Sequence, residues 1–312
     1  MIRHLHPTDS PRLLPFKQAA GIDESFSLAQ AMTGATRPFS AVKFAGVALS
    51  PRAWESCWIQ TRRSLVQAIV RAGPRSGPLA WEVREFFVHR AYAAQCWDVL
   101  EQLAILAGSH GARRLFIRLP EDSAVFEQAR RAGFAPVVTE TLYRAASAAD
   151  AFDMLGGSPP ETALRPRMNG DAEPLFRLYC AATPMEARRG RGQTAEEWAD
   201  ACERPGKWQS ELVLDDGSGH LKAHIQMADL PAGRCFSSVW SPNSREDTRA
   251  LLSFALSGAK PGPAMTLVPS YDESLGAVLA DAGFVAVQSY ETLVKMLAVP
   301  VLEPGRAVAA VG

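Results

Sequence analysis

Apolar and polar positions alternate in short stretches all along the chain, and alternation with a period of two predicts β-strands with one buried face. Several of these stretches are bounded by turn residues, which favours hairpin connections between them. In the first half the predicted strands are residues 1–7, 57–63, 65–73, 78–90, 113–120 and 134–144; in the second half they are 162–167, 210–216, 221–228, 234–241, 264–270 and 284–297.

Other stretches place apolar residues at helical spacing. In the longest of them, Val99, Leu100, Leu103 and Leu106 fall on one face, and Gly111 follows as a stop. The predicted helices are 9–20, 93–111 and 123–133 in the first half, and 171–182, 194–203, 244–258 and 273–283 in the second. Each half thus combines an antiparallel meander with a strand–helix–strand–helix–strand ending. This order predicts an α/β fold with a mixed sheet, present twice.

A repeated phrase supports the duplication. "RRAGFAPVVTETLYR" and "ADAGFVAVQSYETLVKM" share Ala-Gly-Phe, an alternating apolar stretch and Glu-Thr-Leu, and their glycines, Gly133 and Gly283, lie 150 residues apart. That period is much longer than a solenoid unit, so two similar domains are expected. The glycines and prolines between residues 156 and 160 indicate a linker. The expected organisation is a domain over 1–146, a linker over 147–162, a domain over 163–298 and an apolar tail over 299–312.

Composition narrows the class of protein. The chain has 312 residues, 47% of them hydrophobic, with 33 basic and 33 acidic residues, so no net charge favours nucleic acid or an anionic membrane. Its five cysteines form no close pairs, which indicates buried thiols in a reducing compartment and no disulfide or zinc framework. The first residues lack the apolar core of a signal peptide, and no apolar run approaches bilayer length. We therefore expect a cytoplasmic protein.

The element order and the repeated phrase resemble the GNAT superfamily of acyl-CoA-dependent N-acetyltransferases. The resemblance rests on the long helix at 93–111, the strand at 113–120, and the helix that ends in Gly-Phe before a last strand, in both halves. It implies two tandem GNAT-like domains. It also implies acetyl-CoA as cofactor, no metal, and a small-molecule or peptide amine as acceptor.

In the family the cofactor pyrophosphate binds at the start of the long helix, where glycines and free N–H groups allow close approach. Here the first half has no glycine at this place; the expected cofactor-binding residues are Arg90, Ala93, Ala94 and Gln95. In the second half, Ser244 and Asp247 form a capping pattern, and Glu246 and Asp247 bring carboxylates to the phosphate position. We therefore expect cofactor, if any, in the first half.

The catalytic residues of the family are only partly present. The tyrosine that serves as general acid is replaced by Ala129 and Leu279 at the matching positions. A carboxylate on the strand at 78–90 could serve as general base, and the candidates are Glu82 and Glu85. Because the two lie three residues apart on a strand, they should point to opposite faces. The alternative is that both are surface glutamates paired with arginines.

Three arginines crowd the segment between two predicted helices of the second half. Arg188, Arg189 and Arg191 lie in a glycine-containing stretch expected to be a loop, where they could bind an anionic group of a substrate, RNA or partner protein. The alternative is ion pairing between the domains. The apolar tail, residues 299–312, is a second candidate for contact with a partner.

Two histidines, His220 and His224, are spaced to share one strand face, but no further metal ligand is evident. Two hypotheses remain. The first is an N-acyltransferase that uses the first half, with Glu82 or Glu85 as base and weak, atypical or lost activity. The second is a catalytically inactive tandem scaffold that binds a protein or anionic partner.

Overall fold

The computed structural model describes residues 2–21, 23–50, 56–63, 65–157, 164–203, 208–242 and 245–298, with residues 245–247 described by their backbone alone. The strands are β1 (Ile2–His4), β2 (Cys57–Arg62), β3 (Leu65–Pro74), β4 (Ala80–Val88), β5 (Arg114–Pro120), β6 (Ala135–Ala145), β7 (Leu164–Pro166), β8 (Ser210–Asp215), β9 (Leu221–Leu230), β10 (Gly233–Trp240), β11 (Ala264–Pro269) and β12 (Val285–Met296).

The helices lie between these strands in the same order in both halves. The α-helices are α1 (Ser10–Ala19), α2 (Leu28–Thr33), α3 (Ala41–Leu49), α4 (Trp97–Ser109), α5 (Phe126–Arg131), α6 (Ala148–Met154), α7 (Ala172–Ala182), α8 (Met185–Arg191), α9 (Ala195–Ala201), α10 (Arg245–Leu256) and α11 (Glu273–Asp281), and a 3₁₀ helix, η3 (Arg90–Gln95), precedes α4.

All of the named strands form one 12-stranded sheet, in the order β1-β2-β3-β4-β5-β12-β6-β11-β10-β9-β8-β7. Each half contains one parallel pair that separates after a few residues. β4 pairs with β5 over Ala80–Glu82, and β10 pairs with β11 only at Arg234 and Cys235. Beyond these pairs the strands diverge and leave a V-shaped opening, which we call the splay of that half.

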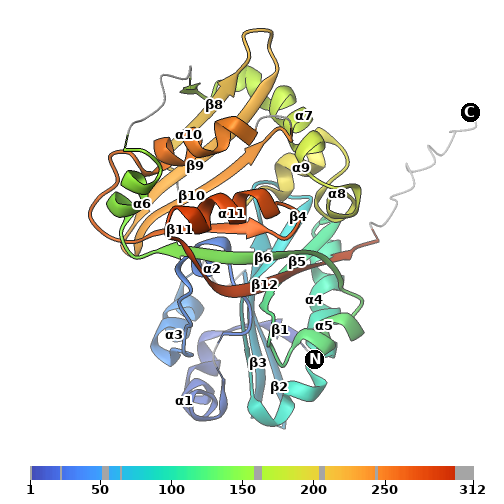
Figure 1. The fold of residues 1–312 in the computed structure, drawn as a ribbon. Coiled ribbons are helices and arrows are strands. Elements are labelled where there is room, and N and C mark those ends of the chain that lie inside the picture. Colours follow the sequence, from blue (N-terminus) through green and yellow to red (C-terminus); the bar gives the residue numbers. More distant parts are fainter. Residues whose placement is uncertain are drawn as a thin grey trace, which may run out of the picture.

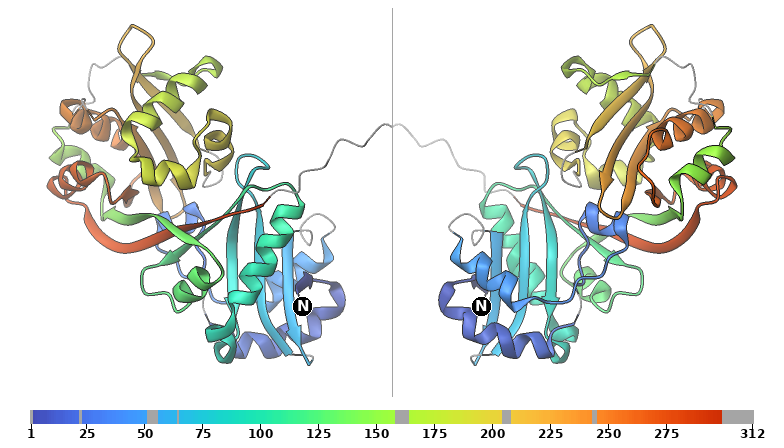
Figure 2. Two further views of the ribbon diagram at one scale, coloured as in Figure 1. Left: turned by 90° about the vertical axis from the view of Figure 1, so that its right-hand side faces the viewer. Right: turned by 90° about the vertical axis from the view of Figure 1, so that its left-hand side faces the viewer.

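The two Gly-Phe strands do not pair with the preceding strand of their own half. β12, from the end of the second half, pairs with β5 of the first, and β6 pairs with β11 of the second. β6 and β12 also pair with each other, so they cross the waist of the molecule side by side (Figure 1). Figure 2 shows the same waist from both sides, with one half above it and the other below. The closing strands of the two halves are therefore exchanged.

Helices cover both faces of each half. In the first half, α4 and α5 bury residues such as Leu103 and Ala129 against one face, and α1 and α3 bury Leu13 and Phe44 against the other. Each fully buried Leu or Phe side chain contributes roughly 1.5–3 kcal/mol through lost contact with water. In the second half, α6, α10 and α11 share one core, and α7 packs on the opposite face. Each half thus has its own cores on either side of the common sheet.

Several segments differ from expectation. Within the segment expected as a linker, residues 148–154 form α6, whose Ala148 and Ala151 are buried in the second-half core. Arg188, Arg189 and Arg191 were expected in a loop, which is wrong: they belong to helix α8. α2 and α3 were not predicted. The apolar tail lies outside the described residues. Within the described ranges no helix is both long and apolar enough to span a bilayer.

Candidate functional site

Glu82 and Glu85 lie on the same face of β4, so the expectation of opposite faces is wrong. A β-bulge shifts the register from Arg71 opposite Glu85 to Ala72 opposite Val83, and the extra residue, Arg84, changes the alternation. Both carboxylates are engaged in ion pairs. Glu85 is 4% exposed, and its Oε1 lies 2.6 Å from Lys43 Nζ and 3.0 Å from Arg71 Nη1.

Glu82 is similarly occupied. Its Oε1 accepts a hydrogen bond from Arg84 Nε at 3.1 Å, and its Oε2 lies 3.3 Å from Arg75 Nε. A general base needs a carboxylate oxygen that can reach a substrate proton. Arginine and lysine partners hold both glutamates, so the geometry favours the structural alternative for the pair.

The start of α4 has few free backbone N–H groups that could bind a phosphate. Arg90–Gln95 form η3, which runs directly into α4, and the amides of Tyr92 and Cys96 donate to the carbonyls of His89 and Ala93. The His89 side chain caps the amide of Ala91. Anion binding at a helix N-terminus requires free N–H groups. Here the chain itself uses them, and the side chains of Arg90, Ala94 and Gln95 are exposed to solvent.

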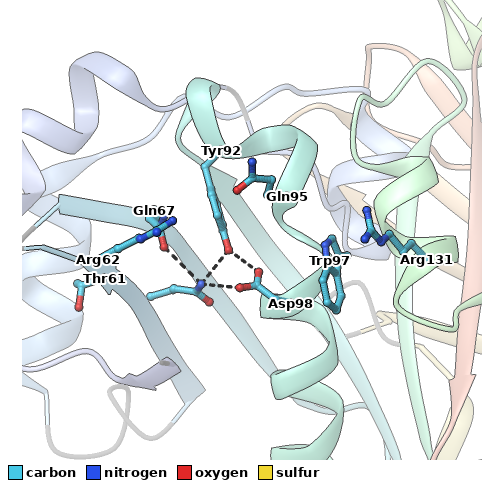
Figure 3. Close-up of a pocket in the computed structure, with 9 residues that line it drawn as sticks. Thr61, Arg62, Gln67, Tyr92, Gln95, Trp97, Asp98 and Arg131 are labelled. Carbon is cyan, nitrogen blue, oxygen red and sulfur yellow. Dashed lines mark hydrogen bonds between the residues drawn. The ribbon is translucent and has the colours of Figure 1, made fainter.

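Figure 3 shows the open hollow beside this helix start, about 670 Å³ in volume. Gln60 lies at its base and donates from Nε2 to Tyr92 Oη at 2.8 Å and to Asp98 Oδ2 at 3.0 Å. Tyr92 also donates to Asp98, and burial together with this carboxylate raises the pKa of the phenol. On the far side Arg131 stacks over the Trp97 ring. Arg62 and Arg131 also line the hollow, so its lining combines one carboxylate with two guanidinium groups.

The splay of the first half is filled by the chain itself. Between α1 and α2, the described residues 20–21 and 23–27 lie between β4 and β5 and hydrogen-bond to both. The amides of Gly21 and Glu24 donate to Val88 and Phe86 of β4, and the amide of Phe26 donates to Arg118 of β5. An extended ligand arm would need these same backbone groups. The first half therefore does not fit a bound acyl-CoA arm.

The splay of the second half is open. A cavity of about 210 Å³ lies between the diverging ends of β10 and β11, lined by residues such as Ser238, Leu267 and Tyr271. In the described part of the chain, β10 is in register with β11 only at Arg234 and Cys235, and residues 236–240 are in register with β9 alone. The two halves thus differ at the same structural position.

A second cavity of about 260 Å³ adjoins the open splay, because Ser237, Val239, Glu140 and Arg191 line both. It lies between α7 and α9 on one side and β9 and β10 on the other. Its aromatic wall includes Tyr179 and Trp198, whose rings stack with centroids 5.5 Å apart. We call the two spaces together the second-half cleft.

Several polar atoms in the second-half cleft are buried and lack a protein partner. They are Tyr179 Oη, Trp208 Nε1, His224 Nε2 and Ser238 Oγ. Such groups are costly unless a ligand or water satisfies them. His224 Nε2 also lies 3.9 Å from Glu211 Oε2, and His224 with Arg167 lowers the pKa of Glu211 to about 2. This end of the cleft keeps an ionised carboxylate beside an imidazole.

A buried network of charges forms the wall between the cleft and the first half. Arg118 Nη2 lies 2.9 Å from Glu140 and 2.7 Å from Glu203, and Arg191 Nη2 lies 2.9 Å from Glu140. Burial would raise the pKa of Glu140, but Arg118 and Arg191 lower it to about 2. Glu203 in turn pairs with Arg75. The wall thus links three arginines to two glutamates by ion pairs.

Of the three arginines predicted from the sequence, only Arg191 lines the cleft. Its guanidinium is paired with Glu140 of β6, the closing strand of the first half. The Nε of Arg188 is buried without a partner, and the side chain of Arg189 is exposed. The geometry thus favours ion pairing between the halves for Arg191.

His220 and His224 lack further ligands: within the described ranges, no group of three or more His, Cys, Asp or Glu side chains could hold a metal ion.

Sequence reasoning missed most of the cleft. Tyr179 and Trp198 read as ordinary apolar positions on helices, and Glu140 belonged to the repeated phrase without a suggested role. One signal was available: Glu140 and Glu291 are the equivalent glutamates of the two Glu-Thr-Leu segments. Only Glu140 is bound by buried arginines.

No protein-family model matches the sequence, and no curated protein matches it either. Solved structures do. A GCN5-related N-acetyltransferase from Sphaerobacter thermophilus is 15% identical with a TM-score of 0.50, and the match covers 95% of each chain. A tandem GNAT protein from the clavulanic acid biosynthesis pathway is also 15% identical with a TM-score of 0.50, covering 95% of this chain and 98% of that one. A functionally unknown conserved protein from Staphylococcus epidermidis has a TM-score of 0.53 at 13% identity, over 77% of this chain and 94% of that one.

At these identities the likeness concerns the fold. It agrees with the element order, the paired splays and the repeated Gly-Phe ending described above. The chain has the fold of the GCN5-related N-acetyltransferases in its tandem form.

Proposed function

We propose that the protein is an acyl-CoA-dependent N-acyltransferase whose reaction takes place in the second-half cleft. The observation that carries this proposal is the difference between the splays: that of the second half is an open cavity, whereas residues 20–21 and 23–27 fill that of the first. An acyltransferase of this fold needs an open splay for an extended thioester arm. The sequence led us to expect the cofactor in the first half, but there the amides at the start of α4 are already hydrogen-bonded within η3.

The cofactor would supply an activated acyl thioester. In the second half, the backbone edge of residues 236–240 is the part of the chain that could hold its extended arm, because this edge is not paired from the β11 side in the described residues. The residues after Pro242 that would face the pyrophosphate, including Ser244, lie outside the described ranges. The fit therefore rests on β10 and the open splay.

The acceptor, a small-molecule or peptide amine, would enter the larger part of the cleft. Tyr179 Oη and Trp208 Nε1 are unpartnered and would hydrogen-bond to it, while the Trp198 ring offers an apolar face. His224 Nε2 lies in this space, 3.9 Å from Glu211 Oε2, and forms no hydrogen bond within the described residues. An imidazole nitrogen can accept a proton from an ammonium group. Glu211, which stays ionised, would stabilise the imidazolium that results.

Thermal unfolding with acetyl-CoA and with CoA tests this proposal. A ligand at a hundred times its dissociation constant should add about 2.7 kcal/mol to the stability of the folded protein. Two variants locate the site. Ser238→Trp fills the open splay and should abolish the shift, whereas Ala94→Glu at the exposed start of α4 should leave it unchanged. A shift that is lost in Ala94→Glu and kept in Ser238→Trp would place the site in the first half and refute the proposal.

The second candidate function is a catalytically inactive tandem scaffold that binds a protein or anionic partner. The observation that favours it is the filled splay and closed helix start of the first half. Arg191 does not support anion binding by such a scaffold, because its charge is already paired with Glu140. If neither acetyl-CoA nor CoA shifts the unfolding temperature at millimolar concentration, the scaffold becomes the better description.

A further inference from the structure

The segment that fills the first-half splay, described over residues 20–21 and 23–27, hydrogen-bonds through its backbone to the edge of β4. Ala20 forms an antiparallel bridge with His89. The amide of Gly21 donates to the Val88 carbonyl at 3.3 Å, and that of Glu24 donates to the Phe86 carbonyl at 2.9 Å. We call residues 20–21 and 23–27 the plug.

Asp23 anchors the plug. Its side chain is 1% exposed, and its Oδ1 accepts hydrogen bonds from the amides of Phe86 at 2.8 Å and Ser25 at 3.1 Å. Oδ2 accepts from Gln30 Nε2 at 3.2 Å. A buried carboxyl is tolerated where hydrogen bonds satisfy its oxygens, so this geometry fixes the plug against β4. Ser25 adds a hydrogen bond from Oγ to the Val83 carbonyl at 2.5 Å.

Beyond Asp23 the plug crosses to the other half. The amide of Phe26 donates to the Arg118 carbonyl of β5 at 2.9 Å, and the Phe26 ring lies 5.2 Å from the Tyr290 ring of the exchanged strand β12. Phe26 and Met32 of α2 share one buried cluster with Cys235 of β10 and Leu267 of β11. Leu28, the next residue after the plug, lines the second-half cleft.

We propose that the plug is a permanent internal occupant of the first-half splay, and that the first half binds no acyl-CoA but serves to position the wall of the second-half cleft. The first part of the proposal depends only on the contacts of the plug. The second part rests on the proposed function, because it assigns Leu28 and α2 to the site of acyl transfer. In the first half, a segment of the chain itself would then occupy the position that a cofactor arm occupies in an open splay.

Native-state amide hydrogen exchange on the full chain tests the first part. The amides of Glu24, Phe26 and Phe86 should be protected to within about tenfold of the β3–β4 ladder amides, because a permanent plug opens only with the surrounding structure. If these three amides exchange more than roughly a thousandfold faster than that ladder, the plug opens locally and the proposal is wrong.

A matched pair of variants separates the plug from general destabilisation. Asp23→Ala should remove protection selectively at Glu24 and Phe86. Asp9 provides the control: it is also 1% exposed and lies in the same half, but it pairs with Arg3 and Arg12. Asp9→Ala should lower protection throughout the first half without selecting the plug. Equal patterns in the two variants would show that Asp23 does not anchor the plug.

Titration with acetyl-CoA tests the second part. At most one molecule should bind per chain, and Asp23→Ala should weaken this binding at least tenfold relative to Asp9→Ala, although Asp23 lies in the other half. Two molecules per chain would overturn the proposal, as would unchanged affinity in Asp23→Ala. No binding at all would refute the proposed function, and the exchange experiment would still decide whether the plug is permanent.

Discussion

Arg191 of helix α8 donates from Nη2 to Oε1 of Glu140 at 2.9 Å, although Glu140 lies on the closing strand of the other half. The remaining oxygen of Glu140 accepts from Arg118 and from Thr292 of the exchanged strand β12, each at 2.9 Å. One buried carboxylate thus joins both halves and both exchanged strands. Removing this carboxylate should therefore lower the stability of the contact between the two halves.

Replacing Glu140 with Gln should destabilise the protein by about 3–5 kcal/mol, because it leaves the buried cations of Arg118 and Arg191 without their shared counter-charge. Urea unfolding at pH 7 measures the change. The effect should shrink in acid, because folding lowers the pKa of Glu140 to about 2. The stability that its charge contributes is fully present above the pKa of the unfolded state and is lost as pH falls through about 2.

The exposed pair of Arg177 and Glu173 on α7 provides the control for this variant. Their side chains are 68% and 57% exposed, so Arg177→Ala should change stability by less than about 1 kcal/mol. A loss in Glu140→Gln no larger than that in Arg177→Ala would mean that the network does not join the halves energetically.

Asp23 should make the protein less stable as pH rises. Burial raises the pKa of Asp23 to about 7, although the amides of Phe86 and Ser25 partly oppose this. The folded state then holds a proton that the unfolded state releases from about pH 4 upward, so stability is full below the unfolded pKa and falls until about pH 7. Asp23→Asn keeps an acceptor at Oδ1 and removes the titration.

Chemical unfolding of the wild type and Asp23→Asn between pH 4 and 8 measures this effect. The stability of the variant relative to the wild type should rise across this range by up to about 4 kcal/mol, the free energy of a shift of about three pKa units. A constant difference between the two proteins would show that Asp23 is ionised in the folded state throughout.

Gly190 permits the close approach of α8 to β6. A Cβ at this position would lie 2.4 Å from Cγ2 of Val137, closer than real contacts allow. Gly190→Ala should therefore destabilise the protein by about 1–3 kcal/mol through overpacking. Thermal unfolding of Gly190→Ala alone and with Val137→Ala checks the cause: the second substitution should restore part of the loss, and no restoration would point to another cause.

Because the closing strands are exchanged, we expect that neither half folds alone. A fragment of residues 1–157 lacks β12, which pairs with β5, and a fragment of residues 158–298 lacks β6, which pairs with β11. Each would expose an unpaired strand edge, which promotes association. Size-exclusion chromatography and circular dichroism should show aggregated or weakly structured fragments and a folded complex on co-expression. Two monomeric, cooperatively folding fragments would contradict this expectation.

Much of the fold follows from the sequence because its signals are local. Alternation predicted the strands, and the spacing of Val99, Leu103 and their neighbours predicted α4. The pairing of β12 with β5 did not follow, because either Gly-Phe strand could complete either half and the choice depends on contacts distant in sequence. The plug was not predicted for the same reason, because its partners on β4 lie 58 or more residues away in the sequence.

The site was the least predictable part. The bulge at Arg84 placed Glu82 and Glu85 on one face of β4. Its trace in the sequence is a change of phase in the buried apolar series, from Trp81 and Val83 to Phe86 and Val88, which the sequence reasoning did not use. The three arginines were seen, but whether they face solvent or a carboxylate depends on Glu140, which comes from the other half. The second-half cleft was missed because its aromatic lining resembles a core until the cavity itself is known.

The exchange of β6 and β12 also bears on how the chain is made. On a ribosome, residues emerge in order, so β5 is synthesised about 165 residues before the strand that pairs with it. Throughout that interval the first half has a gap in its sheet, with two apolar strand edges awaiting a partner. A chaperone that shields β5 and β6 until β12 arrives would therefore have a longer task here than for two domains that each close on themselves.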